Sequence, residues 1–292
     1  MQQAINKAAA LVEAHQYIQR FYNKAIVIKI GGSIMDDPEA LRSLIVDVCF
    51  MDAVGMRPVL VHGGGKNITE AMEKAGLEAQ FVQGRRYTDE RTLAIAEHVL
   101  VSEINTPIVQ QINALEHHGV GLHSLTSCVV FAKRLFLPAQ DGSGRKIDIG
   151  QVGDVAWVNA DLINALIAGE FIPVIAPIAR DPAGGKLNVN ADSVAGHVAA
   201  AIKAEKLVLV SDTHGIRTGA DDSTLARSLT KAQIQDLVAS KVIGSGMLPK
   251  VEAAFTALEA GVHKAHIIDG RIPHCVLLEV YTDEGIGTEI VL

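Results

Sequence analysis

The chain has 292 residues, of which 49% are hydrophobic, so it can bury one large core or two modest ones. Its 26 basic and 33 acidic residues give a net charge of −7. This charge argues against general binding to nucleic acid or to an anionic membrane, because both need a positive field over a whole face. Any anionic ligand must therefore be bound by a local group of donors.

Three cysteines, Cys49, Cys128 and Cys275, lie far apart and show no metal-binding spacing. This pattern is typical of reduced, buried thiols rather than of disulfides or zinc ligands. No apolar stretch reaches the roughly 18 residues of a membrane span, and the start of the chain lacks the basic and apolar regions of a signal peptide. We therefore expect a cytoplasmic protein that binds neither membranes nor nucleic acid.

Residues 1–24 predict an amphipathic helix. Apolar side chains recur there at helical spacing, at Ala10, Leu11, Ala14, Tyr17, Ile18 and Phe21. This helix precedes the first core strand and has no obvious sheet to cover. It either packs on its own subunit or reaches to another subunit.

Two apolar strands that run into glycines are the most informative feature of the chain. Residues 26–30 include Lys29 and lead into Gly31-Gly32, and residues 58–62 lead into Gly63-Gly64-Gly65. Glycine lets the main chain approach a ligand closely, and N–H groups that point out of a turn bind anions. Either turn alone is consistent with an ordinary strand-to-helix connection. The two together, beside a lysine, predict a polyphosphate site.

Further apolar strands alternate with helical patterns, which predicts an α/β fold with a mostly parallel sheet between layers of helices. Asp37 is the predicted cap of a helix that starts at Pro38 and ends near Gly55. More strands are predicted at residues 128–131, 171–176, 207–211, 266–269 and 288–291. The polar, turn-rich residues 135–153 predict a surface hairpin that could cover a substrate.

The second half of the chain contains two polar segments at predicted helix starts. Asn188-Val189-Asn190-Ala191-Asp192 precedes a helix predicted over residues 193–204, so Asp192 is either a helix cap or a carboxylate of a site. A glycine-rich loop ends in Lys250, directly before a helix predicted over residues 251–260. A lysine at a helix start opposes the helix dipole, which indicates that Lys250 binds an anion.

A phosphoryl-transfer site needs cations on both sides of the moving group, backbone donors to its oxygens and a carboxylate that holds the cations in place. Lys29 and Lys250, the glycine amides and Asp192 can supply these parts. The chain lacks a Walker pattern, the protein-kinase catalytic-loop signatures and a GxGxxG turn after a strand. The common nucleotide-binding folds therefore fit this sequence poorly.

Five ordered segments resemble the motifs of the amino acid kinase superfamily, and from about residue 11 onward the chain is most similar to the acetylglutamate kinase family. The segments are VIKIGGS at 27–33, VHGGG at 61–65, GRRYTD at 84–89, NVNAD at 188–192 and GMLPK at 246–250. The resemblance implies an open αβα sandwich, with acyl-substrate binding and dimerisation in residues 25–180 and ATP binding in residues 181–292. The implied reaction is the second step of arginine biosynthesis, in which ATP phosphorylates the γ-carboxylate of N-acetyl-L-glutamate to give N-acetyl-L-glutamyl 5-phosphate.

The resemblance also implies catalytic roles for single residues. Lys29 and Lys250 would stabilise the transferring phosphoryl group, Gly32 would donate its amide to it, and Asp192 would hold both lysines. No protein metal site is implied, because Mg²⁺ would arrive bridging the ATP phosphates.

Binding roles follow from the same resemblance. Gly64 and Gly65 would hold the γ-carboxylate end of the substrate, and Arg86 and Asn188 would bind the rest of it. An arginine fork suits a carboxylate, and an asparagine amide both donates and accepts. Nucleotide contacts are implied for Gly31, Ser211, Asp212, Gly244, Gly246 and Met247.

Residues 11–21 resemble the extra helix of the arginine-inhibited members of the family, in which paired helices link dimers into a hexameric ring. A homo-hexamer, a trimer of dimers, is therefore expected, with L-arginine as an inhibitor. Its pocket would lie between Tyr17 and residues 283–288, which include Glu284 and Gly287. A helix predicted over residues 93–114 matches the main dimer contact of the family, or it is a plain core helix.

Some positions depart from the family pattern. Arg85 and Tyr87 replace leucine and valine, residues 123–126 replace a Gly-Lys-Asp stretch, and Thr213-His214 replaces a more apolar pair. Arg85 and Tyr87 flank Arg86, whose guanidinium is predicted to bind a carboxylate of the substrate. Three functions therefore stay open. These are an acetylglutamate kinase, a sister kinase for another acidic substrate such as an aminoadipate derivative, and a catalytically silent arginine sensor. The presence of both lysines and Asp192 argues against the silent sensor.

Overall fold

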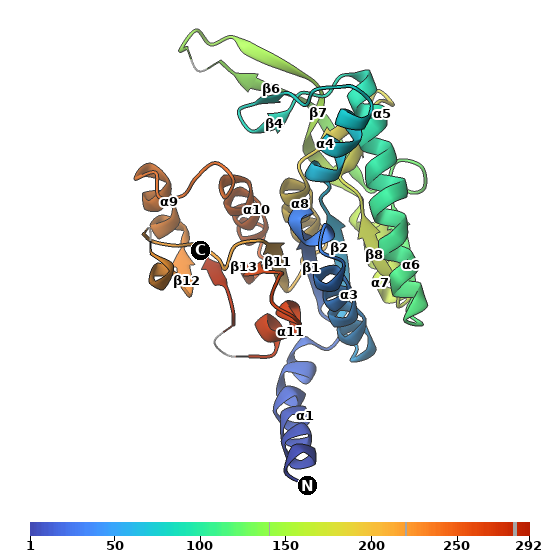
Figure 1. Cartoon of the computed structure of the whole chain (residues 1–292), viewed down its shortest axis with the longest axis vertical. Coiled ribbons are helices and arrows are strands. Elements are labelled where there is room, and N and C mark those ends of the chain that lie inside the picture. The colour runs from blue at the N-terminus through green and yellow to red at the C-terminus, as the bar shows by residue number, and fades with distance from the viewer. Residues whose placement is uncertain (140, 220, 283–284) are drawn as a thin grey trace.

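The computed structural model describes residues 1–139, 141–219, 221–282 and 285–292. The main sheet has eight strands: β1 (Ala25–Ile30), β2 (Arg57–His62), β5 (Gly119–Leu122), β8 (Ile172–Ile175), β11 (Lys206–Ser211), β12 (Ser228–Thr230), β13 (Lys264–Asp269) and β14 (Thr288–Val291). Their order is β12-β14-β13-β11-β1-β2-β8-β5, and only β13 and β14 pair antiparallel (Figure 1). The predicted mostly parallel sheet is confirmed.

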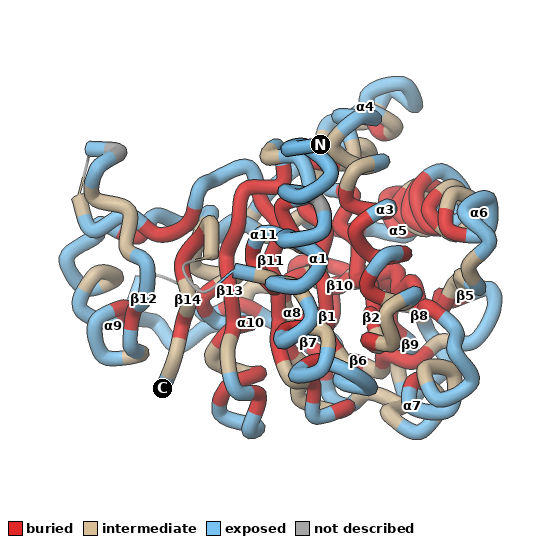
Figure 2. Tube along the Cα trace, turned by 90° about the horizontal axis from the view of Figure 1, so that it is seen from below, coloured by how far each residue is buried: buried red, intermediate tan, exposed pale blue. Residues whose placement is uncertain are grey.

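Successive side chains of the central strands point to opposite faces of the sheet. Ile26, Ile28 and Ile30 of β1 pack into one hydrophobic core, and Val27 packs into the other. Lys29 therefore points to the same face as Val27. Figure 2 shows that the buried residues are concentrated in these strands and on the inner faces of the helices.

Helices cover both faces of the sheet, which confirms the αβα sandwich. The Ile28 face is covered by α3 (Pro38–Ala53), α4 (Gly65–Lys74), α5 (Glu90–His98), the π-helical segment η1 (Val99–Asn105), α6 (Thr106–Ala114) and α11 (Cys275–Val280). The Val27 face is covered by α7 (Ala160–Ala168), α8 (Ala191–Ala201), α9 (Lys231–Ala239) and α10 (Leu248–Glu259). Two short helices are α2 (Gly32–Met35) and η2 (Asp222–Thr224).

Helix α3 begins as the sequence predicts, because the Asp37 side chain accepts hydrogen bonds from the backbone N–H groups of Glu39 and Ala40. Two other helices begin earlier than predicted. Helix α8 is capped by Asn190, whose side chain accepts from the Ser193 amide, so Asp192 lies inside the first turn and is not the cap. Helix α10 begins at Leu248 and has Pro249 in its first turn, so Lys250 also lies inside the helix.

The helix predicted over residues 93–114 also begins earlier, at Glu90, where the Asp89 side chain accepts from the Thr92 amide. It continues through η1 into α6. The predicted burial of the cysteines holds for Cys49 and Cys275 but not for Cys128, which is only partly buried.

A second, smaller sheet is separate from the main one. It closes on itself and consists of β6 (Val130–Pro138), β7 (Lys146–Val158), β9 (Ile178–Arg180) and β10 (Lys186–Val189). Strands β6 and β7 form the predicted hairpin at residues 135–153, which extends from the top of the molecule in Figure 1. The strand predicted at residues 128–131 begins two residues later than predicted, because β6 starts at Val130. The hairpin touches the short pair β3 (Phe81–Val82) and β4 (Arg85–Arg86), because Gln83 Nε2 donates to Pro138 O at 2.8 Å.

Helix α1 (Gln2–Phe21) projects away from the rest of the subunit (Figure 1). Its last turns pack on the body through Tyr17 and Phe21, which are buried. Earlier apolar residues stay outside, and Leu11 and Val12 are 68% and 76% exposed. Among the described helices, none combines the length and apolarity needed to cross a bilayer.

Helices α8 and α10 pack with their backbones almost in contact. A Cβ atom on Gly196 would lie 2.6 Å from Ala253 O and 2.9 Å from Ala253 Cα, so only glycine fits there. Gly196 lies one helical turn after Asp192, and Ala253 lies three residues after Lys250. The close approach therefore places the first turns of the two helices side by side.

Replacing Gly196→Ala should force α8 and α10 apart and lower the free energy of unfolding by about 1–3 kcal/mol, the usual cost of overpacking a core. Urea denaturation measures this change. Gly185→Ala is the matched control, because a Cβ there would meet no atom closer than 3.8 Å. Equal stability of the two variants would show that the helix contact tolerates a methyl group.

Candidate active site

Three charged side chains from distant segments meet at the carboxyl end of β1. Lys29 Nζ lies 2.8 Å from Asp192 Oδ1, and Lys250 Nζ lies 3.6 Å from Asp192 Oδ2. Lys29 comes from β1, Asp192 from the first turn of α8 and Lys250 from the first turn of α10. The structure thus brings together the two lysines and the aspartate that the sequence predicted as one group.

Lys29 and Asp192 of this group are buried, Lys250 is half-buried, and the group has a net positive charge. Lys29 and Asp192 are 6% and 5% exposed. Burial alone would raise the pKa of Asp192, but the charges of Lys29 and Lys250 outweigh burial and hold the pKa below its usual range. Burial lowers the pKa of Lys250, and Asp192 offsets this only in part. Two cations share one carboxylate, so a further anion beside them would be stabilised.

The two glycine turns face each other next to this group. A Cβ on Gly32 would lie 3.9 Å from the amide nitrogen of Gly65. Across the described part of the chain, no group accepts a hydrogen bond from the N–H of Gly32, Gly64 or Gly65. Several free backbone donors and a positive cluster therefore surround one point, which is the arrangement that binds phosphate or carboxylate oxygens.

The first cavity, which we call the acyl cavity, has a volume of about 250 Å³ and opens onto both glycine turns. All the predicted substrate and catalytic residues except Lys250 line it: Lys29, Gly32, Gly64, Gly65, Arg86, Asn188 and Asp192. The sequence did not predict its apolar wall, which includes Ile68, Phe81, Leu100, Val152 and Pro177. These residues have no sequence signal that separates them from ordinary core residues.

Arg86 and Asn188 of the acyl cavity are each held by hydrogen bonds. Arg86 Nη2 donates to Gly65 O at 2.7 Å and to Thr69 Oγ1 at 2.6 Å, and its guanidinium lies 4.8 Å from the centre of the Phe81 ring. Asn188 Nδ2 donates to Thr88 Oγ1 at 3.3 Å. Both side chains keep further hydrogen-bonding capacity, since arginine has five N–H donors and asparagine can also accept.

A second cavity of about 400 Å³, the nucleotide cavity, lies beyond β11. Three of the predicted nucleotide residues line it: Asp212, Gly244 and Met247. Gly31 and Ser211 lie at the neighbouring ends of β1 and β11, where Gly31 N donates to Val210 O at 2.9 Å, and they do not line the cavity. Gly246 lines neither the acyl nor the nucleotide cavity.

The sequence prediction missed three basic residues of the nucleotide cavity, Arg217, His214 and Arg271, and the last two of these share one partner. Both are held by Asp269, a buried carboxylate at the end of β13. Arg271 Nη2 lies 2.6 Å from Asp269 Oδ2, and His214 Nδ1 lies 3.0 Å from the same oxygen. The sequence Asp269-Gly270-Arg271 at the end of β13 was the available signal, because it repeats the pattern of a strand followed by a glycine and a charge.

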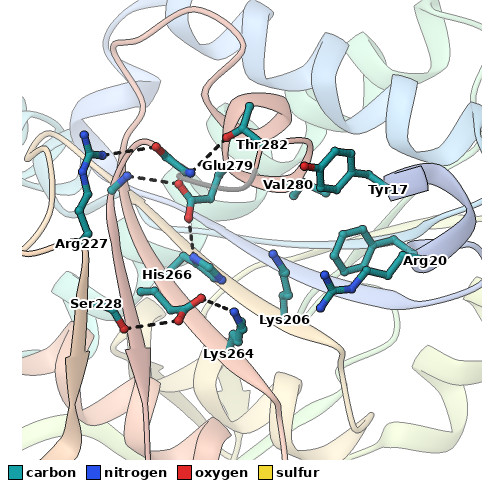
Figure 3. A pocket seen from close by; sticks show the side chains of 14 residues that line it. Tyr17, Arg20, Lys206, Arg227, Ser228, Lys264, His266, Glu279, Val280 and Thr282 are labelled. Carbon is teal, nitrogen blue, oxygen red and sulfur yellow. Dashed lines mark hydrogen bonds and ion pairs between the residues drawn. The ribbon is translucent and has the colours of Figure 1, made fainter. Parts of the chain in front are cut away.

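A third cavity of about 640 Å³, the α1 cavity, lies at the opposite end of the strands (Figure 3). Tyr17 and Gly287 line it as predicted, whereas Glu284 lies outside the described residues. The sequence prediction missed its charged lining, which comprises Arg20, Lys206, Arg227, Lys264, His266, Glu279 and Glu289. Lys206 and His266 had a usable signal, because Lys206 stands at the start of the apolar strand β11 and His266 lies between apolar residues of β13.

Glu279 organises one side of the α1 cavity. Its carboxylate lies 2.5 Å from His266 Nδ1 and accepts from the amides of Ile286 and Gly287. Burial would raise the pKa of Glu279, but His266 and these amides hold it below the usual range. On the other side, burial lowers the pKa of Lys206, whose Nζ lies 4.9 Å from the centre of the Phe21 ring. Negative and positive groups thus face one space.

Similarity to known proteins agrees with this geometry. The model of the amino acid kinase family matches residues 24–269. The acetylglutamate kinase of Symbiobacterium thermophilum is 44% identical to this chain over 291 residues, or 99% of both chains. That of Moorella thermoacetica is 45% identical over 289 residues, or 98% of both chains.

Two solved structures share the fold. The N-acetylglutamate synthase from Neisseria gonorrhoeae, complexed with coenzyme A and N-acetyl-glutamate, gives a TM-score of 0.84 at 24% identity, and the match covers 98% of this chain but 63% of that one. Giardia carbamate kinase gives a TM-score of 0.64 at 15% identity, with 92% and 99% covered. At these identities the likeness shows the fold alone. From the family model and the full-length relatives, we conclude that the chain belongs to the amino acid kinase family and, within it, to the acetylglutamate kinases.

Proposed function

We propose that the chain transfers the γ-phosphoryl group of ATP to the γ-carboxylate of N-acetyl-L-glutamate, giving ADP and N-acetyl-L-glutamyl 5-phosphate. The observation that carries this proposal is the buried Lys29–Asp192–Lys250 group beside the free amides of two glycine turns. The names of the full-length relatives support the choice of substrate.

The substrate would bind in the acyl cavity with its γ-carboxylate at the amides of Gly64 and Gly65. Arg86 would then bind the α-carboxylate, since its guanidinium is held at the cavity wall by Gly65 O and Thr69. Asn188 would bind the acetylamino group, which offers one donor and one acceptor. A backbone amide and a guanidinium both prefer anionic partners, so two carboxylates spaced as in acetylglutamate suit this cavity.

The chemistry needs no general base, because a carboxylate is already an ionised nucleophile at pH 7. The barrier instead comes from bringing one anion towards another. Lys29 and Lys250 would neutralise the charge on the transferring phosphoryl group, and the Gly32 amide would donate to one of its oxygens. Asp192 would keep the two ammonium groups from repelling each other. Fixing both reactants in line would supply the remaining acceleration.

ATP would occupy the nucleotide cavity, with its phosphates directed towards Lys250 and the Gly31-Gly32 turn. No group of three or more carboxylate, histidine or cysteine side chains that could hold a metal ion occurs in the part of the chain that the structure describes. We therefore propose that Mg²⁺ is held mainly by the ATP phosphates, where it offsets their charge. In this proposal residues 25–180 supply most of the acyl site and residues 181–292 the ATP site, with Asn188 reaching across to the acyl cavity.

We further propose that L-arginine binds in the α1 cavity and inhibits the enzyme. The guanidinium would pair with Glu279, and the α-carboxylate would lie near Lys206, which is buried and has its pKa lowered. Buried His266 Nε2 has no hydrogen-bond partner among the described residues, which favours a polar ligand there. Because Tyr17 of α1 forms part of this wall, the bound ligand would also act on the helix that is proposed to link dimers into a hexamer.

Substrate choice is tested by ADP release from the purified protein. We expect turnover with N-acetyl-L-glutamate and little with L-glutamate or L-aminoadipate. Lys250→Ala should lower kcat by about 10²–10³, as expected for loss of one transition-state donor, and leave the KM for acetylglutamate within a few-fold. Lys74→Ala, an exposed lysine on α4, is the control. Turnover of aminoadipate above that of acetylglutamate would instead support the sister kinase, which Arg85 in the cavity wall would favour.

The alkaline limb of the pH profile tests the state of Lys250. Burial lowers the pKa of Lys250, so its ammonium should lose a proton at a lower pH than an ordinary lysine. The kcat/KM for ATP, which reports the free enzyme, should therefore fall as pH rises while still below the usual lysine range. In Lys250→Arg this limb should disappear, because arginine keeps its charge. An identical alkaline limb in both proteins would assign the titration to another group.

Arginine inhibition is tested by adding L-arginine to the same assay. We expect inhibition by L-arginine but not by L-citrulline, which has nearly the same shape and no positive charge. Glu279→Gln should weaken inhibition by about tenfold or more, as for loss of one charged hydrogen bond, with the KM values unchanged.

Deleting residues 1–23 should abolish the response to L-arginine and leave a dimer in sedimentation velocity. A truncated protein that stays hexameric would refute the proposed role of α1.

A further inference from the structure

A histidine with no assigned role lies directly before the second glycine turn. His62 ends β2 and is completely buried. Its Nδ1 lies 2.9 Å from Gly63 O, and its Nε2 lies 3.1 Å from Asn105 Nδ2. Asn105 Nδ2 also donates to Val174 O at 2.9 Å, which fixes the orientation of the amide.

These contacts determine which ring nitrogen carries the proton. A carbonyl oxygen only accepts hydrogen bonds, so His62 Nδ1 must donate to Gly63 O. The Asn105 NH₂ group only donates, so Nε2 must offer its lone pair. Burial lowers the pKa of His62 to about 4, which keeps the ring neutral at pH 7. His62 is therefore the neutral Nδ1–H tautomer.

The hydrogen bond to Gly63 O sets the direction of the next amide. The C=O of Gly63 and the N–H of Gly64 belong to one planar trans peptide and point in opposite directions. A peptide between two glycines has no side chain that resists its rotation. Holding Gly63 O against His62 turns the Gly64 N–H away from the ring, and Gly64 is one of the residues that line the acyl cavity. This N–H has no partner among the described residues.

Asn105 is held in place by an irregular helix. It is the last residue of the π-helical segment η1 and is buried, and a wider helical turn of this kind is frequent near functional sites. Gly121 packs against its Oδ1, where a Cβ atom would overlap the oxygen. The Nδ2 group of Asn105 in turn hydrogen-bonds to the second ring nitrogen of His62 and to the β8 backbone at Val174. The surroundings of Asn105 therefore select one tautomer of His62.

We propose that His62, oriented by Asn105, is a positioning residue that aims the Gly64 N–H at the carboxylate of the acyl substrate. The inference rests on the proposed function, because it names what holds the amide that binds this carboxylate. Neither side chain touches the substrate. Loss of the Nδ1 donor should therefore weaken binding of the acyl substrate and leave binding of ATP unchanged.

Two variants of equal shape separate this role from simple core packing. Asparagine and leucine side chains have nearly the same size and shape, so His62→Asn and His62→Leu remove the same outer part of the imidazole ring. Only asparagine can donate a hydrogen bond from the place of Nδ1. We expect His62→Leu to raise the KM for N-acetyl-L-glutamate by about tenfold or more, as for a lost hydrogen bond to a charged group, and His62→Asn to raise it much less. The KM for ATP and the melting temperature should be similar in the two variants. Equal acetylglutamate KM values would overturn the positioning role.

The tautomer itself can be measured in the unmodified protein. In ¹⁵N-histidine-labelled protein at pH 7, long-range ¹H–¹⁵N spectra should show His62 as the neutral Nδ1–H form, assigned by the signal that His62→Asn removes. A neutral Nε2–H form or an imidazolium at His62 would overturn the inference, whatever KM values the two variants show. If the wild-type protein released no ADP with acetylglutamate, the proposed function would fail, and the tautomer would still decide whether His62 orients the glycine turn.

Discussion

The sharing of one buried carboxylate by two lysines is the interaction on which the rest of the site depends. Lys29 and Lys250 come from segments more than 200 residues apart in the sequence, and Asp192 lies between their ammonium groups. Without Asp192 the two neighbouring cations would repel each other, and with it one positive charge remains uncompensated. The fold maintains this arrangement through the close contact of α8 and α10 at Gly196, which leaves no space for a side chain. A phosphoryl group would complete the charge balance.

The parallel sheet brings the other parts of the site to the same place. Strands β1 and β2 are neighbours in register, with Ile30 opposite His62, so their glycine turns emerge side by side. Strand β11 pairs with the other edge of β1, which places the acyl cavity on one side of the lysines and the nucleotide cavity on the other. Ligand sites outside the carboxyl ends of parallel strands are a general property of such sheets.

The α1 cavity lies at the amino ends of the same strands, where Lys206 and Lys264 begin β11 and β13. Short α11 connects this cavity to the rest of the subunit. Its Glu279 lines the cavity, its neighbour Tyr281 packs edge-on against both Tyr17 of α1 and Phe50 of α3, and His274 before it contacts Asp47 of α3 at 2.7 Å. Movement of Glu279 would therefore be transmitted to α1 and α3 together, which is a physical path between the proposed arginine site and the position of α1.

Much of this protein was determined by patterns that are local in the sequence. The apolar strands, the glycine turns after β1 and β2, the cap at Asp37 and the hairpin at residues 135–153 each depend on neighbouring residues, and the structure has them all. The family assignment and the kinase class, which rest on ordered motifs, are also confirmed. Helix starts at Ala191 and Leu248 were missed because capping depends on the backbone conformation of the residue before the helix. Only the tertiary structure decided the apolar wall of the acyl cavity, the charged lining of the α1 cavity and the contact of His62 with Asn105. These depend on which strands become neighbours and which helices cross, and a sequence pattern carries no distance between residues that are far apart along the chain.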